Sequence, residues 1–197
     1  MFFYLAKFVL YPWIRFYFGA KMTGKEHVPK KGTPFIVCAN HFSALDPVSM
    51  GVLFPGRIRP MAKAELFEKW YLKLLLGTLL GAFPVKRGEV DLKTIKTSLK
   101  YLQENKVIGI FPEGTRNKTD EVIAEPGVAM LAIKAKVPVI PVSIHGKYKF
   151  RGGLKLTVGE PIHLDQYYGE KLKSSDYTEI SLEIMKNCLL YTSDAAD

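Results

Sequence analysis

The sequence predicts an α/β fold: a single domain with a mixed, largely parallel sheet flanked by helices, preceded by an N-terminal amphipathic helix at a membrane interface. Short apolar runs rich in β-branched residues predict buried strands at residues 34–39, 107–111 and 139–144. Amphipathic segments lie between them, and strands that alternate with helices favour parallel pairing. A chain of 197 residues, 48% hydrophobic and 24% charged, suits one domain.

The N-terminal segment, residues 1–21, is almost wholly apolar and aromatic. On a helix, Lys7, Arg15 and Lys21 fall within about 120° of one another and leave a broad apolar face. A membrane span would bury two cations at about 2.5 to 3.5 kcal/mol each, and Pro12 would break a hydrogen bond midway. We therefore expect a helix that lies in the interface. A helix packed on its own domain is the alternative, whereas a signal peptide fits poorly because the charges lie inside the apolar stretch.

The expected domain, residues 22–187, contains no repeat and no linker. Leu92, Ile95, Leu99 and Leu102 recur at helical spacing. Residues 137–142 read Val-Pro-Val-Ile-Pro-Val, and the two prolines restrict this strand to an edge or bulged position with a packing role. The other expected elements are helices over residues 90–104 and 128–136, an edge strand over 154–158 and a final helix from about Ser174.

A second apolar stretch, residues 70–83, is interrupted only by Lys73, Thr78 and two glycines. Three interpretations fit it: a core helix, a second membrane-contacting helix, or one wall of a tunnel for an acyl chain. The sequence does not choose among them.

The composition limits the chemistry of the partners. A net charge of +9 indicates an anionic partner such as a membrane surface, a phosphorylated substrate, an acidic carrier protein or nucleic acid. The two cysteines, Cys38 and Cys188, provide neither a disulfide framework nor the spacing of a metal site, so we expect a reducing compartment and no metal. Cys38 lies in an apolar run and is expected in the core.

The last ten residues, 188–197, resemble the translation of a sequencing adapter read through in frame. We interpret them as a non-native tail and exclude them from the domain. This removes Asp194 and Asp197 and no cation, so residues 1–187 carry 9 + 2 = +11. The interpretation also implies that the final helix is cut short.

A candidate catalytic pair lies in residues 40–47, Asn-His-Phe-Ser-Ala-Leu-Asp-Pro. A neutral imidazole takes the proton of an attacking hydroxyl, and a carboxylate on its other ring nitrogen fixes the tautomer. His41 and Asp46 supply both groups. Asp46 also has a structural interpretation as a helix N-cap, with Pro47 at the first helical position. The two roles are compatible because a capping carboxylate is held rigidly.

A candidate anion site follows the second predicted strand, where residues 111–116 read Phe-Pro-Glu-Gly-Thr-Arg. Ligands of α/β sheets bind at the carboxyl ends of strands. Gly114 permits a tight turn there, Arg116 offers a planar fork for phosphate oxygens, and Thr115 adds a hydroxyl. Glu113 accepts from a substrate hydroxyl or holds Arg116. The alternative is a turn with a solvated ion pair.

Two adjacent cations, Lys86 and Arg87, end the apolar stretch before Gly88 and form a second candidate phosphate contact. A solvated approach to the next helix explains them equally well.

Taken in order, these blocks and the run at residues 137–142 resemble the four sequence blocks of the glycerophospholipid acyltransferases, and most closely the bacterial lysophosphatidic acid acyltransferases. The resemblance covers most of residues 20–165. It implies transfer of a fatty acyl group from a thioester to the sn-2 hydroxyl of lysophosphatidic acid. The implied roles are a general base and its partner (His41, Asp46), phosphate contacts (Lys86, Arg87, Arg116) and substrate positioning (Glu113, Gly114, Thr115).

The resemblance further implies that the acyl donor is acyl carrier protein or coenzyme A thioester, that no cofactor is needed, and that nucleic acid is not a partner. We expect a monotopic protein on the cytoplasmic face of the cell membrane, bound to anionic lipids. One departure is Glu125 before Pro126 and Gly127, where the family often has a lysine. Three alternatives stay open: another lysolipid or amino-lipid acceptor, a thioester hydrolase, although no G-x-S-x-G elbow is present, and a non-catalytic module for anionic surfaces.

Overall fold

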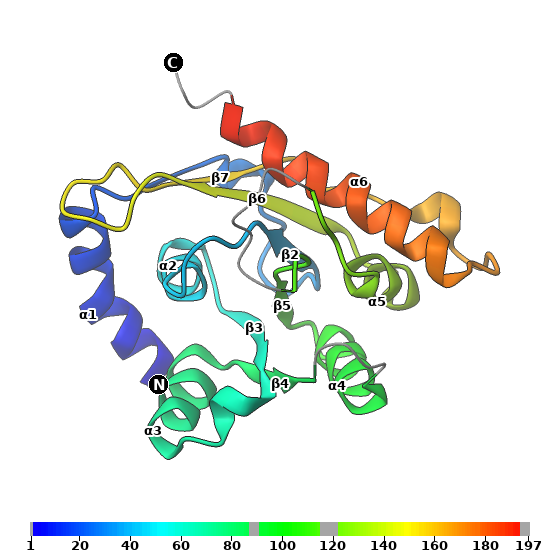
Figure 1. Ribbon diagram of the computed structural model, residues 1–197, viewed down its shortest axis with the longest axis horizontal. Coiled ribbons are helices and arrows are strands. Elements are labelled where there is room, and N and C mark those ends of the chain that lie inside the picture. The colour runs from blue at the N-terminus through cyan, green and yellow to red at the C-terminus, as the bar shows by residue number, and fades with distance from the viewer. Residues whose placement is uncertain (1, 87–90, 115–121, 194–197) are drawn as a thin grey trace.

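The apolar runs form the centre of a seven-stranded sheet in the computed structural model, which describes residues 2–86, 91–114 and 122–193 (Figure 1). The strand order is β1-β7-β6-β2-β5-β3-β4. Neighbouring strands pair in parallel except β6 and β7, so the predicted mixed, largely parallel sheet is confirmed. The strands are β1 (Lys21–Thr23), β2 (Ile36–Ala39), β3 (Ile58–Lys63), β4 (Phe83–Val85), β5 (Val107–Ile110), β6 (Val139–His145) and β7 (Lys155–Val158).

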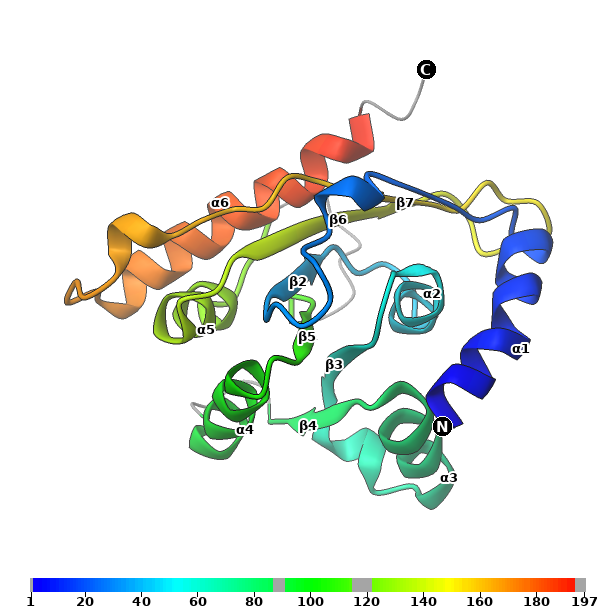
Figure 2. The same ribbon diagram turned by 180° about the vertical axis from the view of Figure 1, so that it is seen from behind.

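Helices cover both faces of the sheet, as Figures 1 and 2 show. In β2, Ile36 and Cys38 pack in the core under α4, α5 and α6, whereas Val37 and Ala39 pack in the core under α1 and α2. A central strand buried on both faces is apolar without alternation, which is why its run is continuous. The helices are α1 (Phe2–Tyr17), α2 (Asp46–Leu53), α3 (Trp70–Lys73), α4 (Leu92–Gln103), α5 (Gly127–Ala135) and α6 (Ser174–Ser193), with 3-10 turns η1 (Lys25–His27), η2 (Ala64–Phe67) and η4 (Asp165–Tyr167) and a π-helix η3 (Leu74–Leu80).

Two positions were expected for the strand over residues 137–142, an edge or a bulge. The edge is wrong, because β6 pairs with β2 on one side and β7 on the other. The carbonyl of Pro141 accepts a hydrogen bond from the N–H of Gly159, just past the end of β7. The N and C=O of a strand residue face the same side. The N–H that Pro141 lacks would therefore face Gly159, so the proline falls where the pairing of β6 with β7 ends.

The expected edge strand at residues 154–158 forms as β7 but is not an edge, because β1 pairs with it in parallel. The sequence did not indicate β1, β3 or β4. β1 and β4 have only three residues each, and β3 contains Pro60 and two cations. These strands hold their places through pairing and not through an apolar run of their own.

Residues 70–80 form α3 and η3, and the core-helix interpretation of this stretch is wrong for its outer face. The side chain of Trp70 is 77% exposed, and the outer face also exposes Tyr71, Leu74 and Leu75. On the inner side, Leu72 and Leu76 are partly buried and Leu80 is buried. The segment therefore packs on the domain with one side only.

The N-terminal helix α1 packs on its own domain through Phe3 and Ile14, which are buried. Its two cations also face the protein: Lys7 Nζ donates to the carbonyl of Phe54, and Arg15 Nη1 donates to the carbonyl of Ala20 at 2.7 Å. Partial burial and the charge of Lys25 lower the pKa of Lys7. The outer face is left with apolar and aromatic side chains, namely Tyr4, Leu5, Phe8, Val9, Trp13 and Phe16.

No helix in residues 2–86, 91–114 and 122–193 is long and apolar enough to cross a membrane. The helix α6 begins at Ser174 as predicted and continues to Ser193, into the segment interpreted as a non-native tail. The origin of that segment stays a prediction. Cys38 and Cys188 are both buried and not linked by a disulfide, and the thiol of Cys188 donates to the carbonyl of Cys38 at 3.3 Å.

Candidate active site

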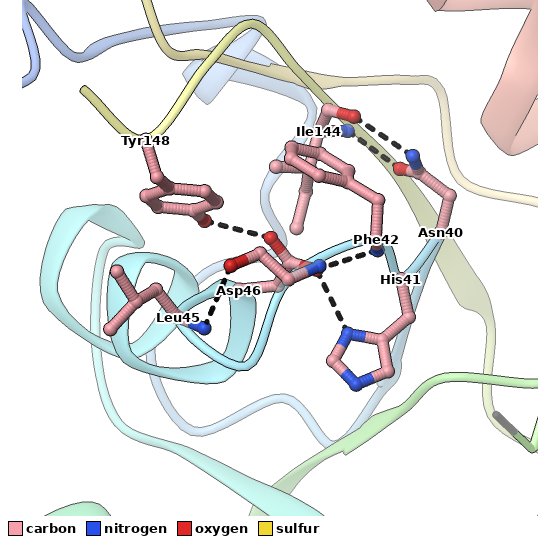
Figure 3. A network of polar contacts seen from close by, with 8 residues as sticks. Asn40, His41, Phe42, Leu45, Asp46, Ile144 and Tyr148 are labelled. Carbon is pink, nitrogen blue, oxygen red and sulfur yellow. Dashed lines mark hydrogen bonds and ion pairs between the residues drawn. The ribbon is translucent and has the colours of Figure 1, made fainter. Parts of the chain in front are cut away.

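The chain after β2 brings His41 and Asp46 together, as the motif predicts. His41 Nδ1 lies 2.9 Å from Asp46 Oδ2 (Figure 3). An ionised carboxylate only accepts hydrogen bonds, so Nδ1 carries the proton and Nε2 keeps its lone pair. Nε2 points away from Asp46, and the ring is 13% exposed. This geometry suits a general base, with the free nitrogen facing outward.

Asp46 is completely buried, and its carboxylate accepts four hydrogen bonds. Besides His41, Oδ2 accepts from the backbone N–H groups of Phe42 at 2.8 Å and Ser43 at 2.6 Å. Oδ1 accepts from the hydroxyl of Tyr148 at 2.8 Å. These donors replace the water that the charge loses on burial and fix the orientation of the carboxylate.

The interpretation of Asp46 as an N-cap is wrong, although Pro47 does stand in the first turn of α2. The residue before the helix is Leu45, and no side chain caps the helix. Instead, the Asp46 carboxylate accepts hydrogen bonds from the backbone N–H groups of residues 42 and 43 and from the imidazole of His41. The carboxylate therefore serves the loop and the histidine, not the helix end.

Asn40 fixes the base of this loop to the neighbouring strand. Its side-chain nitrogen donates to the carbonyl of Ile144 at 2.8 Å, and its oxygen accepts from the N–H of Ile144 at 2.7 Å. This pair of bonds continues the contact between β2 and β6 one residue past the end of β2. No role was predicted for Asn40, although an amide directly after a buried strand was a signal of such a clamp.

Tyr148 is the other site residue for which no role was predicted from the sequence. It lies on the connection between β6 and β7, 102 residues from Asp46. Burial and the charge of Asp46 raise the pKa of Tyr148 far above its usual range, so the phenol stays protonated and donates. Its ring packs edge-on against Phe18, with ring centres 5.3 Å apart, and beside Phe42 at 5.6 Å. No local pattern marks such a residue, because only the fold brings it to Asp46.

A cavity of about 370 Å³ lies on the α4 and α5 side of the sheet, at the carboxyl ends of β4 and β5. Phe111 lines this cavity, and its ring also packs against the imidazole of His41 in a tilted arrangement, with ring centres 4.5 Å apart. Phe111 therefore links the imidazole to the wall of the cavity. The wall is mostly apolar, with Met61, Val85, Ile95, Ile110, Met130 and Leu131 among the lining residues.

The structure describes three of the six predicted binding residues. Lys86 and Gly114 line the cavity, whereas the side chain of Glu113 is buried. Gly114 has φ of 65°, and the carboxylate of Glu125 occupies the place where a Cβ atom would lie, so the turn requires glycine. The other predicted residues, Arg87, Thr115 and Arg116, lie outside the described residues.

The departure from the family pattern also falls in the cavity, because Glu125 lines it. Of the described lining residues, Lys86 is the cation, and Asp91 and Glu125 are the acids. The first turn of α5, from Gly127, opens into the same space. Its amide groups add partial positive charge. In the part of the chain that the structure describes, no group of His, Cys, Asp or Glu side chains is placed to hold a metal ion.

Known proteins are similar to this chain in sequence and in fold. A family model described as acyltransferase matches residues 19–145. A 1-acyl-sn-glycerol-3-phosphate acyltransferase of Bacillus subtilis is 37% identical over 151 residues, which are 74% of this chain and 74% of that protein. The match to the Saccharomyces cerevisiae protein of the same name is 34% identical over 63% of this chain and 42% of that protein.

The crystal structure of the 1-acyl-sn-glycerophosphate acyltransferase PlsC from Thermotoga maritima superposes with a TM-score of 0.69 over 98% of this chain and 79% of that chain, at 22% identity. That likeness shows a common fold. The family model covers more than half of the chain, and the Bacillus protein is matched over more than two thirds of it. The chain therefore belongs to the acyltransferase family of enzymes.

Proposed function

We propose that the protein transfers a fatty acyl group from a thioester of acyl carrier protein or coenzyme A to the sn-2 hydroxyl of lysophosphatidic acid, which gives phosphatidic acid. The observation that carries the proposal is the His41 and Asp46 pair, 2.9 Å apart, next to a cavity that Lys86 lines. The activity for which the relatives from Bacillus subtilis and Saccharomyces cerevisiae are named supports this choice of acceptor.

The reaction uses His41 as the general base. Nε2 takes the proton of the acceptor hydroxyl while the hydroxyl oxygen attacks the thioester carbonyl and forms a tetrahedral intermediate. The carbon–sulfur bond then breaks, and the imidazolium returns the proton to the departing thiolate. Asp46 stabilises the imidazolium through Nδ1. No covalent acyl-enzyme is required, because the base serves both steps.

The cavity is the proposed site of the acceptor. Its apolar wall suits the acyl chain and glycerol backbone of a lysophospholipid, and Lys86 with the first turn of α5 suits the phosphate. We assign phosphate contacts also to Arg87 and Arg116, and substrate positioning to Glu113, Gly114 and Thr115. These assignments rest on the family resemblance.

The helix α1 is the proposed contact with the membrane. Both of its cations bond to the protein, so the outer face carries no charge, and Phe8 is 78% exposed on it. An aromatic, uncharged helix face that rests on a folded domain suits the depth of lipid headgroups. The net charge of +9 favours an anionic surface and an acidic carrier protein. We place the enzyme on the cytoplasmic face of the cell membrane, where both occur.

An acceptor panel tests the proposal. Purified protein receives one acyl donor together with lysophosphatidic acid, lysophosphatidylcholine, a lyso-amino-lipid or no acceptor. We expect lysophosphatidic acid to give the highest kcat/KM. A preference for an acceptor without a phosphate monoester would overturn the proposed substrate while leaving the acyltransferase family unaffected.

Lys86→Ala is expected to raise the KM for lysophosphatidic acid about tenfold with little change in kcat, because one charge-assisted contact contributes about 1.5 kcal/mol. Initial rates at varied acceptor concentration measure this change. Lys96→Ala is the matched control, since Lys96 is exposed on α4 and does not line the cavity. An equal KM in both variants would remove Lys86 from the phosphate site.

Tyr148→Phe is expected to lower kcat about tenfold and leave KM unchanged, because one hydrogen bond to the Asp46 carboxylate is lost while the ring contacts remain. If Tyr148 acts only through Asp46, the same change in an Asp46→Asn background has no further effect on kcat. Tyr101→Phe, a partly buried tyrosine on α4, is the control. A multiplicative loss in the double variant would contradict the role of Tyr148 as a positioning residue.

A further inference from the structure

A second apolar surface lies on the segment from η2 to η3, far from α1 in the sequence. Exposed fractions reach 77% for Trp70 and 56% for Leu74, although both belong to a strongly apolar stretch. A contiguous exposed patch of large apolar side chains on a folded domain marks a contact surface. We call this surface the α3 patch; its members are Leu66, Trp70, Tyr71, Leu74 and Leu75.

The α3 patch is continuous with the outer face of α1. The helix α1 contacts η3, and both views place its N-terminal end beside α3 (Figures 1 and 2). Tyr4 is exposed at that end of α1 and adds to the apolar surface there. Two segments separated by more than 50 residues therefore present apolar faces along one side of the molecule.

The composition of the α3 patch suits a phospholipid bilayer. Trp70 and Tyr71 combine an apolar ring with a polar group, which is the residue type found at the depth of lipid headgroups. Lys69 and Lys73 are exposed next to them, and their long apolar stems let the charges reach the headgroups. Glu68 is exposed beside these cations, so the preference for anionic headgroups rests on the net charge of +9.

The topology places the α3 patch on the side of the sheet where the parallel strands have their carboxyl ends, which is also the side of the candidate active site. β3 leads into η2 and α3, and β2 leads into His41. β2 and β3 both pair in parallel with β5, so both strands end at the same edge. A bilayer in contact with the patch therefore lies near the carboxyl ends of the strands, where β2 leads into His41.

We propose that the α3 patch is a second membrane-docking segment, which enters the interface of an anionic phospholipid bilayer together with α1. Two contacts fix the orientation of the domain on the membrane, whereas a single helix would leave it free to tilt. This orientation rests on the proposed function only in that the acceptor is a membrane lipid. The docking itself is independent of catalysis.

The sequence offers a direct test because it contains two tryptophans, Trp13 on α1 and Trp70 in the α3 patch. Trp13→Phe leaves Trp70 as the reporter, and Trp70→Phe leaves Trp13. Each variant is mixed with vesicles of phosphatidylglycerol and phosphatidylcholine whose acyl chains are brominated at a shallow position. We expect the fluorescence of both reporters to shift to shorter wavelength and to be quenched, relative to vesicles without bromine.

Vesicle partitioning measures the contribution of the patch. Leu74→Asp is expected to lower the partition coefficient about tenfold or more, because a leucine that enters the bilayer interface is replaced by a charge. Leu92→Asp is the matched control, since Leu92 is exposed on α4 and lies outside the patch. Thermal unfolding of both variants checks that the domain stays folded.

The outcomes separate the two segments. Quenching of Trp13 without quenching of Trp70 overturns the proposal and leaves α1 as the membrane contact. Quenching of neither overturns both membrane contacts, while acyl transfer measured in detergent still tests the proposed reaction. A dimer that forms without vesicles and dissociates on Leu74→Asp assigns the patch to a second copy of the chain and also overturns the proposal.

Discussion

His41→Ala lowers kcat for acyl transfer by about 10²- to 10⁴-fold, the range that general acid–base catalysis contributes. The loss follows from the geometry, because Nε2 is the free nitrogen of a ring whose Nδ1 is bonded to Asp46. The KM values should change little, since the cavity that we assign to the acceptor does not include the imidazole. Initial rates with lysophosphatidic acid and an acyl thioester measure both constants.

His163→Ala is the matched control for this variant. His163 is exposed, and it follows Ile162, which bridges to Val139 at the beginning of β6, the end of the sheet opposite to His41. Its rate should equal that of the wild type. Near-normal turnover of His41→Ala, with the same unfolding temperature, would contradict the assignment of the base.

Asp46→Asn is the second large effect, with an expected fall in kcat on the order of 10²- to 10⁴-fold. The amide oxygen can still accept from the amides of Phe42 and Ser43, so the loop keeps most of its geometry. The neutral side chain does not stabilise the imidazolium that forms when His41 takes the proton. The free energy of unfolding should also fall by about 1 to 3 kcal/mol, because the hydrogen bonds to a charge are weakened.

The double variant His41→Ala with Asp46→Asn distinguishes a shared role from two separate ones. If Asp46 acts through His41, the double variant is no slower than His41→Ala alone. Denaturant unfolding, measured in parallel, separates the structural loss from the catalytic loss. An additional loss of kcat in the double variant, at unchanged stability, would mean that Asp46 acts on the substrate by another route.

The central strands were predictable because they are buried on both faces. β2 and β5 form inside the apolar runs at residues 34–39 and 107–111, and β6 spans the run at residues 139–144 and one residue more. The outer strands were not predictable, since three-residue strands have too few residues to show a pattern. β3 was not predicted because it contains the charged residue Arg59, which interrupts an apolar pattern. The guanidinium of Arg59 lies over the ring of Tyr101 at 5.3 Å.

The site could be predicted as far as its residues are neighbours in sequence. The spacing of His41 and Asp46 indicated their hydrogen bond, and the turn after β5 indicated the requirement for glycine at position 114. The third partner of the carboxylate, Tyr148, depends on the path of the chain from β6 to β7, which no local pattern specifies. The position of Asp46 within α2 was misread because a cap and a loop ligand share the same residue type.

The most direct test of the central claim is the ratio of phosphatidic acid formed to thiol released by the purified enzyme, with and without lysophosphatidic acid. Direct transfer to the acceptor hydroxyl predicts one phosphatidic acid per thiol, little thiol release without the acceptor, and loss of both signals in His41→Ala. Thiol release at the same rate without the acceptor would contradict this account, because water and not the lipid hydroxyl would then be the nucleophile.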